Sequence, residues 1–159
     1  MKIEPSEFEQ RVARVMADLR RNSNVFLDDS KIGKQPWHEM ELEGCGSELA
    51  AAKALNVYPD LTNEEPALAD LIFHGNTVDV KVTKYKSGKL LAPLNKKNKS
   101  CDLYVLVIGQ FPNYEVVGVA TKEMLISKDS VIDVGYGRTY GLQQHDLIPI
   151  KDFLELESC

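Results

Sequence analysis

Three side chains suited to metal-assisted hydrolysis lie within a short, otherwise mostly apolar stretch of the chain. They are Asp70, Asp79 and Lys81. Carboxylate oxygens are the ligands that Mg²⁺ and Mn²⁺ prefer, and a lysine beside them can orient or help deprotonate a water and stabilise negative charge. A metal held in this way activates water and offsets charge on phosphoryl oxygens. The trio therefore predicts phosphodiester hydrolysis.

A β-hairpin is the element expected to position these side chains. The runs on both sides of Gly75 and Asn76 are rich in β-branched and large apolar residues, and the Gly-Asn pair suits a tight turn. If these two residues form the loop, Asp70 faces Lys81 and Asp79 lies diagonally nearby. Because side chains alternate along a strand, the opposite face is then apolar throughout. That face comprises Ala69, Leu71, Phe73, Val78, Val80 and Val82.

A helix is expected to bring a further carboxylate, Glu48, to the same place. Residues 47–55 are rich in strong helix formers. Ala51, Ala52 and Leu55 follow Glu48 at i+3, i+4 and i+7, which places the glutamate on or beside the core-facing stripe. The alternative is that Glu48 only occupies the first turn, where acids interact favourably with the helix dipole.

Charge is distributed unevenly along the sequence. The formal net charge is -5, yet Lys81 to Lys99 holds seven lysines and no acid, which leaves 12 basic residues against 24 acidic ones elsewhere. Such a strip beside clustered carboxylates predicts contact with a polynucleotide backbone, with an adjacent tyrosine stacking on a base; the alternative is a solvated loop. The candidate nucleic-acid-binding residues are Lys84, Tyr85, Lys86, Lys89, Lys96, Lys97 and Lys99.

Length and composition fit one globular domain over residues 1–159. No apolar run approaches the roughly 20 residues that span a bilayer, and the first residues lack a signal-peptide segment. These features predict a cytoplasmic protein without a membrane partner. Three widely spaced cysteines fit neither a disulfide framework nor a zinc site, so we expect free thiols.

Helical and strand patterns alternate along the chain and predict the α/β (α+β) class, with a mixed central sheet flanked by helices. The Glu48 helix should follow Gly44 and Gly46 and end near Asn56. Further elements are expected besides this helix and the hairpin. They are a helix over 6–21, an irregular connection over 22–35, a strand buried on both faces over 103–108, a strand over 114–120, a short helix capped by Thr121, an edge hairpin or glycine-kinked strand within 131–140 and a last helix capped by Asp146.

The motif and its context resemble the PD-(D/E)xK, or restriction-endonuclease-like, nuclease superfamily. Asp70, eight further residues and then Asp79-Val80-Lys81 resemble the active-site motif, although Ala69 stands where the motif has proline. Glu48 matches the acid on the preceding helix. The layout from Glu48 to Ile108 resembles the shared core, which would occupy about residues 44–120. The Gly-x-Glu-Leu-Ala helix before this hairpin is also similar to small uncharacterised phage and prophage proteins.

The resemblance implies a restriction-like fold and an Mg²⁺- or Mn²⁺-dependent endodeoxyribonuclease that leaves a 5′-phosphate and a 3′-hydroxyl. Asp70, Asp79 and Glu48 would hold the metal, and Lys81 would be the catalytic lysine. The implied partners are DNA and a second copy of the chain, and the implied setting is the cytoplasm of a bacterium or of a phage-infected cell.

Three other interpretations stay open from the residues alone. The fold could serve a non-catalytic nucleic-acid-binding or protein-interaction module. Asp70 and Lys81 could form an exposed cross-strand ion pair, worth about 0.2 to 1 kcal/mol. Finally, the acidic body of the protein could bind a basic partner, in which case the lysine strip would be dispensable.

Overall fold

Helices and strands alternate along the chain in the mixed α/β class that the sequence predicts. The computed structural model describes residues 1–23, 37–61, 69–95 and 100–157. The helices are α1 (Glu7–Ser23), α2 (Trp37–Leu55), α3 (Lys122–Leu125) and α4 (Ile150–Glu157). The strands are β1 (Lys2–Ile3), β2 (Leu71–Phe73), β3 (Asn76–Thr83), β4 (Leu90–Ala92), β5 (Leu103–Gln110), β6 (Asn113–Thr121), β7 (Val131–Asp133), β8 (Arg138–Leu142) and β9 (Ile148–Pro149).

The strands form two sheets. The larger sheet has the order β1-β6-β5-β3-β2, and β9 pairs with β6. Its β3 and β5 run parallel, whereas its other pairs are antiparallel, so the predicted mixed sheet is confirmed. The smaller sheet has the order β4-β8-β7 and is antiparallel.

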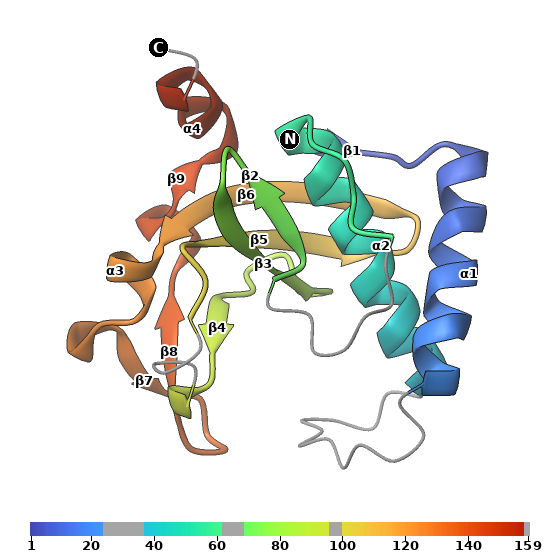
Figure 1. Ribbon diagram of the computed structural model, residues 1–159. Helices are drawn as coiled ribbons and strands as arrows, with labels where there is room; N and C mark the ends of the chain where they lie inside the picture. The colour runs from blue at the N-terminus through green and yellow to red at the C-terminus, as the bar shows by residue number, and fades with distance from the viewer. Residues whose placement is uncertain (24–36, 62–68, 96–99, 158–159) are drawn as a thin grey trace.

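Each face of the larger sheet is covered by a different layer (Figure 1). The alanine-rich end of α2 packs on one face, against β2, β3, β5 and β6, and α4 joins the same cluster. The smaller sheet and α3 cover the other face. Helix α1 packs on the outer side of α2, away from the sheet. The middle of the larger sheet therefore has no solvent-facing side.

Strand β5 confirms the prediction of a strand buried on both faces. Val105 and Val107 pack under α2, whereas Tyr104 and Leu106 pack toward the smaller sheet. All four side chains are fully buried. A continuous apolar run is the pattern expected of such a strand, because both faces must leave water.

Helix α2 begins earlier than the sequence predicts. We expected Gly44 and Gly46 to precede the helix, but both lie inside it. Gly46 is needed there because a Cβ atom at this position would collide with the hydroxyl of Tyr114 on β6. The glycine therefore marks a close helix-to-sheet contact. The predicted end is confirmed, since Asn56 adopts a left-handed φ of 55° after the last helical residue.

Helix α1 confirms the predicted helix at 6–21, with Ser6 as its cap. The Ser6 hydroxyl accepts a hydrogen bond from the Glu9 amide, and the Glu9 carboxylate accepts one from the Ser6 amide, which forms a capping box. The residues buried against α2 are mainly small, including Ala13 and Ala17. Of the connection expected over 22–35, residues 24–35 lie outside the described residues.

The hairpin exists, but its predicted register is wrong by two residues. Phe73 pairs with Asn76, so the loop consists of His74 and Gly75. Both loop residues have positive φ angles, 48° and 85°, as a type I′ turn requires. A shift of two residues leaves the strand residues on their expected face, and Leu71, Phe73, Val78, Val80 and Val82 all pack in the cluster under α2. The prediction fails for Ala69, which precedes β2 and packs against the cluster on the other side of the sheet. The shift also changes the contacts of Asp70: the strand pairing ends at Leu71 and Val78, and the Asp70 amide then donates to the Val78 carbonyl, so the predicted pairing of Asp70 with Lys81 is wrong.

The last third of the chain is partly as predicted. Thr121 caps α3 by accepting a hydrogen bond from the Met124 amide, and β7 and β8 form the expected hairpin. Asp146 does not cap the last helix, however. Its carboxylate accepts from the Gln143 amide in a single 3₁₀ turn, and α4 begins only after Pro149.

Two cysteines fall among the described residues, and both Cys45 and Cys101 are buried free thiols, as predicted. Within the same described ranges, the helices are each too short or too polar to cross a membrane.

Candidate active site

The end of the β2–β3 hairpin brings Asp70 and Asp79 together. The Asp70 amide donates to the Val78 carbonyl at 2.9 Å, and the Asp70 Oδ2 atom accepts from the Val80 amide at 2.6 Å. The Asp70 side chain therefore extends the hydrogen bonding between the two segments to a position before Leu71, the first residue of β2. Asp79 lies between these two β3 residues, and its negative charge is one of the causes that raise the pKa of Asp70.

Lys81 joins the site from the same face of β3. Its Nζ atom lies 2.7 Å from Oδ2 of Asp79. The two side chains differ in their access to water, because 33% of the lysine side chain is exposed against 8% of the aspartate. The ammonium thus stands at the mouth of the site, with the carboxylate behind it.

Glu48 points into the protein from α2, as the alanine spacing predicts, and Arg20 of α1 holds it there. The Arg20 guanidinium donates two hydrogen bonds, one to each carboxylate oxygen, at 2.8 and 2.7 Å. This bidentate arrangement is the strongest form of an arginine–carboxylate pair. Burial and the hydrogen bonds act in opposite directions, and the hydrogen bonds to Glu48 dominate, so the pKa of Arg20 is raised.

Asp70 is the carboxyl group whose charge the site disfavours. Burial, followed by the negative charges of Glu48 and Asp79, raises the pKa of Asp70 from 3.8 to about 6. The hydrogen bond from the Val80 amide and the positive charge of Lys81 act in the opposite direction but do not cancel the rise. Near neutral pH the site therefore holds a carboxylate that costs free energy to keep ionised.

This donor set suits a hard divalent cation in its chemistry. Asp70 and Asp79 offer carboxylate oxygens on adjacent strands, and a cation between them would relieve the repulsion that raises the pKa of Asp70. Glu48 fits less directly, because both of its oxygens already accept from Arg20. As their side chains stand, the described residues contain no group of three acids, histidines or cysteines close enough to share one ion.

A groove of about 680 Å³ opens beside Lys81. Its lining includes Tyr85 and Lys89 from the segment after β3, and Asp133 and Val134 from the β7–β8 hairpin. The ring of Tyr85 is 65% exposed. Of the predicted nucleic-acid-binding residues, Tyr85 and Lys89 thus share a groove with Lys81.

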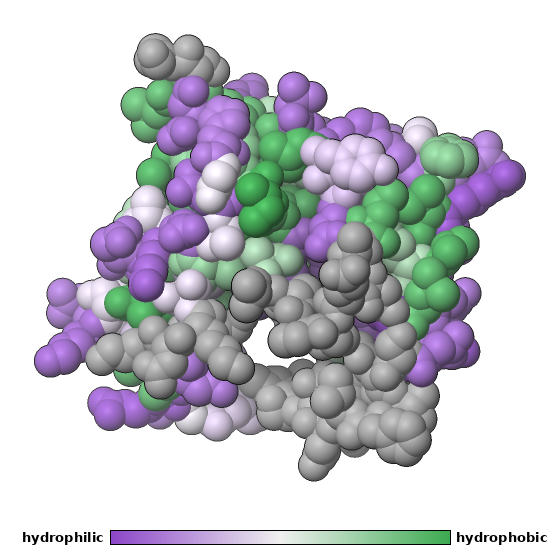
Figure 2. Space-filling view, in the orientation of Figure 1, coloured by the Kyte–Doolittle hydropathy of each residue, from purple (hydrophilic) through white to green (hydrophobic). Residues whose placement is uncertain are grey.

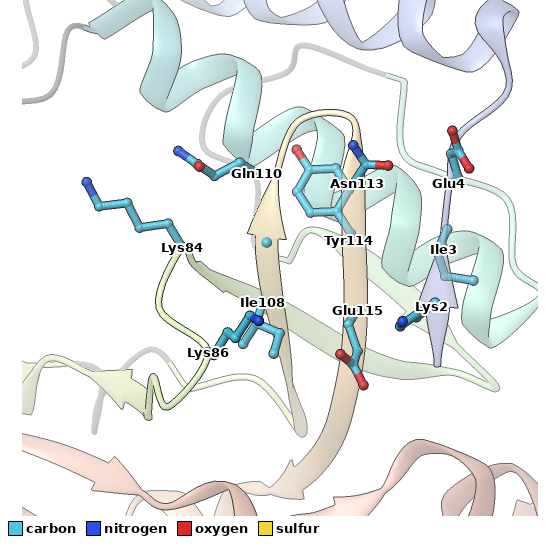
Figure 3. A pocket seen from close by; sticks show the side chains of 11 residues that line it. Lys2, Ile3, Glu4, Lys84, Lys86, Ile108, Gln110, Asn113, Tyr114 and Glu115 are labelled. Atoms are coloured by element: carbon cyan, nitrogen blue, oxygen red, sulfur yellow. The ribbon is translucent and has the colours of Figure 1, made fainter.

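Lys84 and Lys86 belong to a different hollow (Figure 3). This second pocket, of about 550 Å³, lies at the β5–β6 turn and is also lined by Lys2 of β1, Gln110 and Tyr114. The predicted lysine strip is therefore divided between two concave surfaces.

The other lysines assigned to the strip are not all placed. The predicted contacts Lys96, Lys97 and Lys99 lie outside the described residues.

A second carboxylate of α2 shows what a purely structural acid does in this fold. Glu43 accepts hydrogen bonds from the Phe111 amide, at 3.0 and 3.1 Å, and from the Tyr114 hydroxyl at 3.1 Å. It ties the helix to the β5–β6 turn and lies apart from the aspartates in the sheet. Sequence reasoning missed this residue, which has no motif.

Arg20 was also missed, although the sequence carried a usable signal. It follows Ala13 and Ala17 at i+7 and i+3, so it lies on the small-residue face with which α1 packs on α2. A charge on such a face requires a partner, and Glu48 is the acid that meets it.

The chain matches no protein-family model, no curated protein and no solved structure in comparisons with known proteins.

Proposed function

We propose that this protein is a metal-dependent nuclease of the PD-(D/E)xK type that hydrolyses phosphodiester bonds in DNA. The observation that carries the proposal is the position of the Asp70 carboxylate, which accepts from the amide of Val80 next to Asp79, with Lys81 2.7 Å from Asp79. Burial and neighbouring acids raise the pKa of Asp70 to about 6, which is a marker of functional carboxylates.

In this proposal Asp70 and Asp79 are the direct ligands of Mg²⁺ or Mn²⁺. The bound ion would lower the pKa of a water and offset charge on the phosphoryl oxygens. Lys81 is the cation beside these two aspartates, and its side chain is partly exposed to solvent. It is therefore placed to orient the attacking water and to stabilise the negative charge that develops on the phosphate.

Glu48 and Arg20 act behind the ligands. The negative charge of Glu48 is the second cause of the raised pKa of Asp70, after burial. Arg20 keeps that carboxylate fixed and balances its charge. We propose that the pair sets the electrostatic environment of Asp70, and that Glu48 contacts the metal directly only if Arg20 releases one oxygen.

The groove beside Lys81 is the proposed path of the DNA backbone. Lys89 supplies positive charge there, and the exposed ring of Tyr85 offers a stacking surface. A polyanion approaching three carboxylates meets repulsion, which Lys81, Lys89 and a bound cation would offset. The proposed setting is the cytoplasm of a bacterium or of a phage-infected cell, where DNA is accessible.

Cleavage assays test the proposal directly. The purified chain should cut at least one of supercoiled, linear duplex, branched or single-stranded DNA with Mg²⁺ or Mn²⁺ and not with EDTA, leaving 5′-phosphate ends. If none of these DNA forms is cleaved with either metal, the nuclease proposal is wrong.

A non-catalytic nucleic-acid-binding or interaction module is the second candidate. The observation in its favour is that Glu48 and Asp79 each have a cationic neighbour, so the acids can serve charge balance. Calorimetric titration with Mn²⁺ separates the two. Asp79→Ala should abolish heat of binding with the fold intact if the site is a metal centre, and should alter only stability in a module. Asp102→Ala, at an exposed aspartate whose carboxylate accepts from Thr77 and not from the cluster, is the matched control.

A further inference from the structure

The outer face of α1 carries an apolar stripe that the fold does not bury. Phe8 is 75% exposed, Val15 58% and Leu19 52%. Together with the half-buried Val12 they line a shallow apolar groove of about 340 Å³, to which Leu61 contributes from the segment after α2. Figure 2 shows apolar side chains gathered along this helix at the edge of the molecule. The stripe lies to one side of Ala13 and Ala17, which pack on α2.

The spacing of the stripe is that of a coiled-coil seam. Phe8, Val12, Val15 and Leu19 are separated by four, three and four residues, which is the alternation of d and a positions in a heptad. Few monomeric proteins leave such a seam in water, because contiguous apolar patches usually mark interaction sites.

Charges beside the seam are complementary to a second copy in the antiparallel direction. When two copies of α1 run antiparallel so that all four seam residues are used, Phe8 meets Leu19 and Val12 meets Val15 of the other copy. Arg11 and Asp18 then occupy equivalent flanking positions, where each faces the other across the dyad. The two-fold symmetry creates this pair twice.

Both flanking side chains can take part without loss of buried contacts. Arg11 lies 3.5 Å from Glu7 within its own helix turn, and both of these side chains are largely exposed. Asp18 lies 3.9 Å from His38, and its side chain is 59% exposed. Exposed pairs of this kind contribute little, so they exchange partners readily.

We infer that the partner of this face is a second copy of the chain, bound as an antiparallel α1–α1 homodimer. This inference is independent of the proposed nuclease function, since none of the seam residues belongs to the active site. A 17-residue helix is only about 25 Å long, so the seam is a small interface, and we expect a dissociation constant in the micromolar range.

Sedimentation velocity of the full chain tests the inference. Between about 1 and 500 µM, which brackets a micromolar dissociation constant, the protein should shift from monomer to dimer. Val15→Glu should leave a monomer over the whole range, because it places a charge in the centre of the seam. The site is exposed, so circular dichroism should show an unchanged fold.

Charge reversal tests the antiparallel direction. Arg11→Glu and Asp18→Arg should each raise the dissociation constant about tenfold, because each places two like-charged pairs at the dyad. The double variant should return it to within about threefold of the original value. Lys151→Glu, an equal change of charge on exposed α4, should have no effect beyond that of net charge.

Several results would overturn the inference. If the protein stays monomeric at every concentration, the dimer is excluded. The stripe would then bind another protein or be covered by part of this chain. A dimer that persists in Val15→Glu uses another face. If the double reversal does not rescue the single ones, the antiparallel pairing is wrong.

Discussion

Asp70 and Asp102 both accept a hydrogen bond from a backbone amide of β3, yet their carboxyl groups behave in opposite ways. Asp70 accepts from Val80 at 2.6 Å, and Asp102 accepts from Thr77 at 2.8 Å. The pKa of Asp70 is raised to about 6, mainly by burial. The pKa of Asp102 is lowered, mainly by a hydrogen bond from the Thr77 hydroxyl.

The difference lies in the surroundings of each aspartate and not in the backbone contact. Asp102 is open to water and its neighbours stabilise the charged form. Asp70 is largely buried beside Glu48 and Asp79, and ionising its carboxyl group therefore costs free energy. An asparagine could accept from the Val80 amide without the charge, so the cost of the ionised form of Asp70 is a marker of function. Asp102 serves as the structural reference for the predictions below.

The largest expected difference between the two aspartates is in catalysis. Asp70→Asn should reduce DNA cleavage about a hundred- to a thousandfold, because it removes a charged oxygen ligand from the proposed metal site. Asp102→Asn should retain nearly the full rate. Initial rates on the best DNA substrate, at saturating Mg²⁺, measure both. Equal losses in the two variants would show that Asp70 has no special role.

The next largest difference is in stability against pH. The folded protein binds a proton at Asp70 more tightly than the unfolded chain does, so stability from this group falls as pH rises from 3.8 to about 6. Above that range the cost is on the order of 3 kcal/mol. Asp70→Asn should therefore stabilise the fold at pH 7.5, and the gain should vanish near pH 3.8.

Urea unfolding of both variants at several pH values provides the measurement. Asp102→Asn should show the opposite sign, because a lowered pKa in the folded state contributes stability above 3.8 that is lost as pH falls. An Asp70→Asn protein that is less stable than the original at pH 7.5 contradicts the interpretation.

The smallest predicted effect concerns the influence of Glu48 on Asp70. Glu48→Gln removes one of the negative charges that raise the pKa of Asp70, and the amide oxygen can still accept from Arg20. The pKa of Asp70 should move from about 6 toward 3.8, while that of Asp102 stays where it is. Carboxyl carbon chemical shifts followed against pH report both groups in one titration. An unmoved Asp70 would mean that burial alone sets its pKa.

Much of the fold could be predicted from the sequence because its signals are local. The apolar run of β5, the Ser6 cap of α1 and the Thr121 cap of α3 each express themselves within a few residues. The common face of Asp79 and Lys81 on β3 was predictable for the same reason, since strand alternation is a local rule.

The choice between two local turns, and features set by distant contacts, could not be predicted in the same way. The hairpin loop is His74-Gly75 because a type I′ turn places glycine second, whereas the sequence also offered Gly75-Asn76. Gly46 interrupts the helix pattern for a reason that only Tyr114 of β6 explains. The partner of Glu48 comes from α1, which lies 28 residues earlier in the chain.

The path of the chain between the two sheets has a consequence for folding. It leaves the larger sheet after β3 to form β4, returns for β5 and β6, leaves again for β7 and β8, and returns with β9. The smaller sheet is thus built from two separate segments of the chain, β4 and the β7–β8 hairpin, and forms only when they meet. This requirement adds loop-closure entropy to its formation. The groove beside Lys81 has walls from both sheets. We therefore expect the groove to be completed in the final cooperative step of folding, so that partly folded chains do not yet possess it.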